Sequence, residues 1–219
     1  MLPLRANVRT KSISWVTASL ILANGFVFWK ELHLSSGDLE KFILQWGVRP
    51  ALLFHSLDHA RTLISAMFLH AGWLHLLSNM LFLYIFGTRV EDQFGHFKFL
   101  FFYFIVGVLA NLGQAYMVAQ SHLPLIGASG AIAGVLGAYF FYFPHSKITT
   151  LIPIGIFITM REVPAFFFLG LWFILQMFSG VFSNSVYDSG GVAWWAHAVG
   201  FMAGILMAPM FGRKIAKRS

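Results

Sequence analysis

The sequence predicts an all-α polytopic membrane protein with six transmembrane helices. The chain of 219 residues is 58% hydrophobic and only 11% charged, and its mean hydropathy is +0.73. A chain of this composition has too few charged residues to cover the surface of a soluble globule, so it belongs in a lipid bilayer. It contains no cysteine, which excludes disulfides, thiolate metal sites and cysteine nucleophiles.

Stretches free of Asp, Glu, Lys and Arg locate the helices, because a transmembrane helix needs about 20 apolar residues. Such stretches occur at residues 12–29, 62–88, 99–146, 163–187 and 189–212. The longest holds two helices, since polar residues and a proline interrupt it at 120–124. We therefore expect one domain over residues 1–219, with helices near 13–30, 71–88, 97–119, 127–144, 163–182 and 192–211.

Three connections between these helices have a character of their own. The apolar segment 148–160 is too short to cross a membrane and contains Pro153 and Gly155, which predicts an interfacial or hairpin-like connection. The long loop 31–70 contains DLEKFILQWGV, whose mixed charged and aromatic residues predict a helix lying in the membrane interface. The loop 183–193 is polar and contains glycine, as a mobile loop would.

The basic residues predict that both termini are cytoplasmic. In that orientation only Lys30, Lys41, Arg49 and Arg61 of the 15 basic residues face outside. The net charge of +7 is then explained by membrane orientation and not by nucleic-acid binding. No small-residue cleavage site follows a short apolar core at the N-terminus, so the first helix is expected to remain as an anchor. We expect a multi-pass protein of the bacterial inner (plasma) membrane.

Polar side chains gather at one depth of this predicted bundle. They lie within one or two turns of the expected outer ends of three helices: His75, Asn79, Ser129 and His197. A polar side chain in a transmembrane helix costs several kcal/mol unless it has a partner, so each is a functional candidate. Polar residues that only join helices would scatter among several layers. The common depth of these four residues therefore favours a single functional site.

Small residues accompany two of these polar residues at helical spacing: Gly130, Gly134 and Gly137 follow Ser129, and Gly200 and Gly204 follow His197. Positions three or four apart share a helix face, and faces made of small residues let two helices approach closely. The two glycine faces could therefore bring Ser129 and His197 within hydrogen-bonding reach.

The chemistry available to this layer is acyl transfer by a dyad. Ser129 is a nucleophile and His197 its general base, and these helices carry no carboxylate at that depth to form a third member. Asn79, His75 and the Ser129 backbone N–H are donors of the kind that stabilises an oxyanion. No metal or cofactor is expected, because the chain has no H-E-x-x-H motif.

Simpler interpretations exist for each residue taken alone. A serine in a membrane helix commonly bonds a backbone carbonyl, and a histidine or asparagine commonly bonds a neighbouring helix. The G-x-S-x-G elbow of the α/β-hydrolases does not fit, since Ala131 stands at its last position.

Three motifs, in order, make the chain resemble a rhomboid, an intramembrane serine protease. They are FLHAGWLHLLSNMLFLYIFG with His75 and Asn79, GASG with Ser129, and AHAVGFMAG with His197. The resemblance implies a compact six-helix core with a water-filled cavity open to the outside. It also implies that Ser129 is the nucleophile, His197 the base, and that His75 and Asn79 lie at the oxyanion.

The resemblance further implies that the fifth helix and the loop after it gate substrate entry, which assigns Phe168, Trp172 and the 183–193 loop. Two positions depart from patterns found in some rhomboids. Ala133 stands where a tyrosine lies under the histidine ring, and Ala60, not tryptophan, precedes Arg61.

We therefore expect a serine endopeptidase that cleaves transmembrane protein substrates near the outer membrane face. One alternative is a catalytically silent rhomboid-like protein that binds membrane helices. A second is a transporter, although the acids nearest a helix, Glu91 and Asp92, lie at the expected cytoplasmic end.

Overall fold

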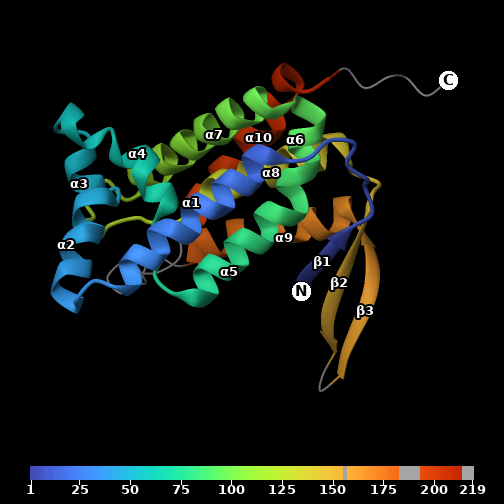
Figure 1. The fold of residues 1–219 in the computed structure, drawn as a ribbon, viewed down its shortest axis with the longest axis horizontal. Helices are drawn as coiled ribbons and strands as arrows, with labels where there is room; N and C mark the ends of the chain where they lie inside the picture. Colours follow the sequence, from blue (N-terminus) through green and yellow to red (C-terminus); the bar gives the residue numbers. More distant parts are fainter. Residues whose placement is uncertain (155–156, 183–192, 214–219) are drawn as a thin grey trace.

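The computed structural model describes residues 1–154, 157–182 and 193–213 as a helical bundle with a small β-sheet at one end (Figure 1). In chain order the elements are β1 (Leu2–Ala6), α1 (Trp15–Leu32), α2 (Ser36–Trp46), α3 (Pro50–Leu53), η1 (Leu57–His59), α4 (Thr62–Ser65), η2 (Ala66–Phe68), α5 (Trp73–Phe82), η3 (Leu83–Gly87), α6 (Thr88–Phe94), α7 (His96–Met117), α8 (Ser129–Tyr142), β2 (Lys147–Ile154), β3 (Phe157–Pro164), α9 (Ala165–Phe182) and α10 (Trp194–Phe211). Helices α2, α3 and α4 lie at the opposite end of the bundle from the sheet (Figure 1).

A helix is present at each of the six positions predicted for a transmembrane helix. The helix expected at 71–88 is longer than predicted, because α5 continues through the π-helical turn η3 into α6. By length and composition α7 and α10 can each cross a membrane, and the bent pair Leu57–Phe68 and Trp73–Phe94 is a third candidate within the described residues. The protein is thus mostly helical with two to three candidate spans, and six crossings remain a prediction.

The all-α expectation is wrong for the connection between α8 and α9. Residues 147–154 and 157–164 form the antiparallel strand pair β2–β3, in which Lys147 pairs with Pro164, and β1 pairs with β2 on its other side. Isoleucine and threonine dominate this segment, and β-branched residues favour strands. The hairpin-like connection predicted at 148–160 is confirmed. The third strand comes from the N-terminus, a pairing that no local pattern announces.

The loop after α1 contains the predicted helix. Helix α2 covers most of DLEKFILQWGV, and the Ser35 hydroxyl caps it by accepting the Asp38 backbone N–H at 3.2 Å. This hydroxyl satisfies one of the backbone donors that a helix leaves free at its N-terminus.

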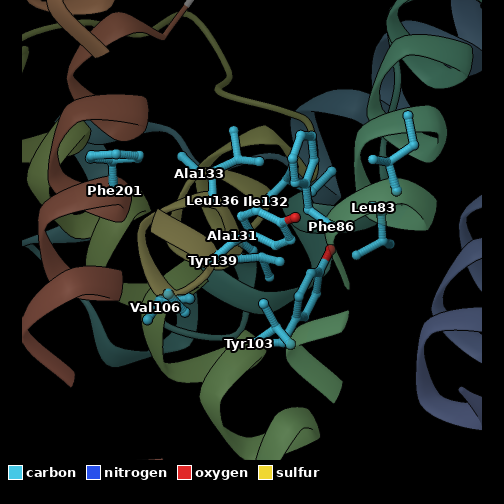
Figure 2. Close-up of a cluster of buried hydrophobic side chains, with 14 of the residues drawn as sticks. Leu83, Phe86, Tyr103, Val106, Ala131, Ile132, Ala133, Leu136, Tyr139 and Phe201 are labelled. Atoms are coloured by element: carbon cyan, nitrogen blue, oxygen red, sulfur yellow. The ribbon is translucent and has the colours of Figure 1, made fainter. Parts of the chain in front are cut away.

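Helix α8 forms the centre of the bundle. Ten consecutive residues, Gly130 to Tyr139, are all buried. A helix that is apolar on every face must be surrounded by other elements, and α8 meets α7, α10 and η3. Figure 2 shows this core, where Tyr139 of α8 lies among Phe86 of η3 and Tyr103 of α7. The serine at the first position of α8 is therefore held by a helix that is buried over most of its length.

Helices α8 and α10 touch backbone to backbone through their glycines. A Cβ atom at Gly200 would collide with the carbonyl oxygen of Gly130, and one at Gly204 with that of Gly134. In the other direction, a Cβ atom at Gly137 would collide with the carbonyl oxygen of Phe201. Only glycine permits this approach, which fixes the distance and register between the two helices.

A buried carboxylate of α6 binds the N-terminal turn of α1. Glu91 accepts the backbone N–H groups of Val16 at 3.0 Å and Thr17 at 2.7 Å, and it also lies 2.6 Å from Nδ1 of His96. A carboxylate at a helix N-terminus satisfies free backbone donors and interacts favourably with the helix dipole. Glu91 therefore has a structural partner for each oxygen, at the end of the bundle away from the polar layer.

Candidate active site

Ser129 and His197 form a direct hydrogen bond between α8 and α10. Ser129 Oγ lies 2.8 Å from Nε2 of His197. Ser129 is the first residue of α8, and His197 lies in the first turn of α10. Gly130 directly follows Ser129, and Gly200 lies one turn after His197. The close approach of these two glycines brings the two helix ends together. His197 is only 8% exposed, so this hydrogen bond is shielded from bulk solvent.

The second ring nitrogen of His197 also has a partner. Nδ1 lies 2.6 Å from Oε1 of Gln176 on α9. An amide oxygen can only accept, so this contact places the imidazole proton on Nδ1 and leaves Nε2 free to accept from Ser129. The sequence prediction missed Gln176. The available signal was that Gln176 is the one amide side chain within the helix expected at 163–182.

Two tryptophans flank the His197 ring. The Trp172 ring centroid lies 5.9 Å away and the Trp194 ring meets the imidazole edge-on at 6.2 Å. Trp172 thus supplies an aromatic neighbour for the His197 ring. In some rhomboids a tyrosine has that role, but its position is occupied by Ala133 in this chain. Phe168, predicted to belong to the gate, is buried in the main hydrophobic core. The rest of the predicted gate, residues 183–192, lies outside the described residues.

Asn79 is oriented by a histidine that the sequence prediction did not assign to the site. Its amide Nδ2 donates to Nε2 of His70 at 3.0 Å, and His70 Nδ1 lies 3.3 Å from the carbonyl oxygen of Phe68. The His70 backbone N–H in turn donates to the buried carboxylate of Glu31 at 3.3 Å. Because one amide hydrogen of Asn79 is used by His70, the side chain is fixed and its other hydrogen remains available.

His75 lies beside the residue that leads into α8. Its Nδ1 accepts the Ala71 backbone N–H at 3.4 Å, which leaves the hydrogen on Nε2. A Cβ atom at Gly127 would come within 2.8 Å of that Nε2 and within 3.8 Å of Ser129 Oγ. Gly127 has a φ of 122°, in the region that favours glycine, so the sequence needs glycine here for both conformation and space.

A cavity of about 900 Å³ joins the four predicted polar residues. Its lining includes His75, Asn79, Ser129 and His197, together with Ile43 of α2 and Trp194 of α10. The structure therefore brings together the four side chains that the sequence placed in one layer. The lining also includes residues of the connection between α7 and α8, such as Leu123 and Leu125. Helix α2, which contributes Ile43, lies at the end of the bundle opposite the β-sheet (Figure 1).

The start of α8 adds backbone donors to this cavity. The first hydrogen bond of the helix runs from the Ile132 N–H to the Ala128 carbonyl at 3.0 Å. Because α8 begins at Ser129, the Ser129 N–H has no hydrogen-bond acceptor within the helix. The positive end of the α8 dipole lies at the same place. Negative charge that develops beside Ser129 would be stabilised there.

Comparison with known proteins decides the family. The family described as Rhomboid domain matches residues 58–214, which is most of the chain and includes all four residues of the polar layer. The chain belongs to the rhomboid family. Rhomboids are integral membrane proteins, in agreement with the apolar helices, and the resemblance inferred from the three motifs is confirmed.

Individual relatives agree with this assignment. The chain is 38% identical over 114 residues to Rhomboid-like protein 11, chloroplastic, of Arabidopsis thaliana, a match that covers 52% of this chain and 40% of the relative. It is 32% identical over 127 residues to Rhomboid-like protease 3 of Toxoplasma gondii, covering 58% and 46% of the two chains. The Putative rhomboid protease YdcA of Bacillus subtilis is 38% identical over 79 residues, covering 36% and 39%.

The matched segments span less than half the length of these curated relatives. The relatives include a chloroplastic protein, a bacterial protein and also RHOMBOID-like protein 6, mitochondrial, of Arabidopsis thaliana, which is 43% identical over 76 residues and covers 35% of this chain and 24% of the relative. The bacterial inner membrane therefore remains a prediction for this rhomboid.

Proposed function

We propose that this rhomboid is an intramembrane serine endopeptidase in which Ser129 is the nucleophile and His197 the general base. The observation that carries the proposal is the 2.8 Å hydrogen bond between Ser129 Oγ and His197 Nε2, made inside a polar cavity. A serine used only for packing has no need of an imidazole partner. A base within hydrogen-bonding reach is the arrangement that activates a hydroxyl nucleophile.

The reaction proceeds in two steps through a covalent intermediate. His197 takes the Ser129 proton as Oγ attacks the scissile carbonyl carbon, and the imidazolium then protonates the leaving amine as the C–N bond breaks. Water next enters the cavity, loses a proton to His197 and attacks the ester carbonyl. The Ser129 oxygen leaves and recovers the proton, which releases the acid product and restores the dyad.

Donors for the tetrahedral intermediate converge on the same cavity. The free amide hydrogen of Asn79, the Nε2 hydrogen of His75 and the Ser129 backbone N–H are assigned to the oxyanion. Asn79 is held by His70 and His75 by the Ala71 backbone, so these donors are arranged before the substrate arrives. Such preorganisation is what makes electrostatic stabilisation of a transition state effective.

The length of α8 supports cleavage within the membrane but near one face. Its 14 residues cover about 21 Å at 1.5 Å per residue, which is less than the roughly 30 Å of a bilayer core. Ser129, at the end of α8 near the cavity and away from the sheet, therefore lies below the membrane surface on that side. With the termini and the sheet cytoplasmic, the cavity opens to the outside.

The substrate class follows from that position. A peptide bond at this depth belongs to a transmembrane helix, whose carbonyl groups are engaged in helical hydrogen bonds. The helix must unwind locally before Ser129 can attack, so residues with low helix propensity are expected near the cut. The proposed substrates are single transmembrane segments with glycine, serine or similar residues close to their outer end.

Cleavage in a defined membrane tests this proposal. The full chain is reconstituted into liposomes with a reporter whose transmembrane helix carries small residues near its outer end, and the fragments are measured. The intact protein should cut the reporter within or beside that helix, and Ser129→Ala should not. Thermal unfolding of the Ser129→Ala variant should match that of the unchanged protein, because Ser129 donates only to His197.

Two outcomes would contradict the proposal. Cleavage that persists in Ser129→Ala removes Ser129 from the reaction. A folded protein that retains the reporter but never cleaves it, under conditions in which both are inserted, indicates a rhomboid that binds membrane helices without catalysis.

A further inference from the structure

We propose that Gln176 is a positioning residue that holds the imidazole of His197 in the tautomer able to accept the Ser129 proton. The inference rests on the proposed Ser129/His197 dyad and adds a third side chain to it. That side chain comes from α9, whereas Ser129 and His197 come from α8 and α10.

The tautomer argument starts from the two nitrogens of a neutral imidazole, of which one donates and the other accepts. Nε2 faces Ser129 Oγ at 2.8 Å, and it can serve as a base only when the ring hydrogen is on Nδ1. That hydrogen needs an acceptor, because His197 is buried. Oε1 of Gln176 provides one at 2.6 Å, a short distance for a hydrogen bond.

Removing the acceptor would penalise the reactive tautomer specifically. The Nδ1 hydrogen would be left buried without a partner, which costs free energy, whereas the Nε2 hydrogen of the other tautomer would still bond Ser129. In that second tautomer His197 donates to Ser129 and cannot take its proton. The population of rings ready to act as a base would therefore fall, while the fold of α8 and α10 would be unaffected.

The neighbourhood of Gln176 orients the ring as well as its proton. Trp172 lies four residues earlier on α9, hence on the same face, and its ring centroid is 5.9 Å from that of His197. Next to it, Phe173 stacks on Phe201 of α10 at 4.8 Å. The acceptor is thus delivered to His197 only where α9 packs against α10, so the readiness of the base depends on that contact.

An amide suits this position better than the carboxylate of a serine-protease triad. Glutamine supplies an acceptor oxygen without a net charge, and a charge at this depth is costly to bury. This explains how a dyad that lacks any acidic third member at its depth can still have its base oriented.

The test compares three α9 variants of the full chain in liposomes. Gln176→Met removes the acceptor with little change in length, Gln176→Glu keeps an acceptor oxygen at the same reach, and Leu175→Met is the control because Leu175 is 53% exposed on the same helix. For each we measure kcat and KM on the transmembrane reporter, the rate of Ser129 labelling by a small fluorophosphonate, and thermal unfolding.

Gln176→Met should lower kcat by about tenfold or more with little change in KM, since a wrongly protonated histidine disables the base without affecting substrate binding. The rate of Ser129 labelling should fall by a similar factor, because His197 would no longer activate Ser129. The probe is small and does not enter as a transmembrane helix does, so this fall could not be due to altered substrate entry. Gln176→Glu should recover most of both rates, and Leu175→Met should match the unchanged protein. Gln176→Leu replaces Gln176→Met if the latter fails to fold.

The inference is overturned if both apolar variants keep the original kcat and labelling rate, or if they raise only KM. It is also overturned if a Gln176→Glu variant that thermal unfolding shows to be folded loses as much as Gln176→Met, because an acceptor oxygen at the same reach would then not restore the base. These results differ from failure of the proposed function, in which the unchanged protein itself is neither active nor labelled at Ser129.

Discussion

The hydroxyl oxygen of Ser129 and Nε2 of His197 lie 2.8 Å apart, although 68 residues separate them in the chain. The contact depends on two helices that meet through glycine backbones, with Gly200 against Gly130 and Gly204 against Gly134. The packing and the proposed chemistry are therefore linked, since the glycines set the distance between the helix ends that carry the two side chains.

Gly204→Ala tests that link. The added Cβ would collide with the Gly134 carbonyl, and relief of the collision must separate α8 from α10. We expect the free energy of unfolding to fall by about 1–3 kcal/mol, as for overpacking of a core, together with a loss of cleavage. Thermal unfolding in detergent and the reporter assay measure the two effects.

Gly25→Ala is the matched control for this substitution. Gly25 lies in α1 and a Cβ there meets nothing within 4 Å, so alanine should stabilise the helix by roughly 0.5–1 kcal/mol. Equal unfolding temperatures for the two variants would contradict the proposed packing role of Gly204.

Asn79→Ala tests the assignment of the oxyanion donors. Loss of one donor is expected to lower kcat by about a hundredfold or more, with KM nearly unchanged, because the bond strengthens only in the transition state. Leu77→Ala on the same helix is the control, since Leu77 is 58% exposed. If Asn79→Ala cleaves at the original rate, Asn79 serves only to hold His70 in the turn before α5.

The predicted orientation can be tested with single cysteines, because the chain has none of its own. Gln120→Cys, between α7 and α8, should react with an impermeant maleimide added outside intact cells. Lys98→Cys, near the start of α7, should react only after the membrane is permeabilised. The reverse pattern would place the cavity on the cytoplasmic side and contradict cleavage near the outer face.

Local patterns predicted much of this molecule. Charge-free stretches located the helices, and the glycine spacing around Ser129 and His197 indicated two faces suited to close packing. The four polar residues shared one predicted depth, and the same four line one cavity. These features depend on the sequence within single helices, where hydrophobicity and the period of 3.6 residues are informative.

The parts that were missed depend on contacts between distant segments. The sheet requires Leu2–Ala6 to pair with Lys147–Ile154, which no local signal specifies. His70 reaches Asn79 from a turn before α5, so helical spacing could not relate the two. Gln176 belongs to no motif, and its partner is known only when α9 is placed against α10.

Site-specific labelling tests the central claim most directly. The intact chain in liposomes is treated with a fluorophosphonate, digested, and the modified peptide is located by mass spectrometry. We predict one covalent adduct on Ser129 and its loss in His197→Ala, with the unfolding temperature of that variant showing that it remains folded. No adduct on Ser129 in the intact protein, or equal labelling in folded His197→Ala, would contradict a nucleophile activated by His197.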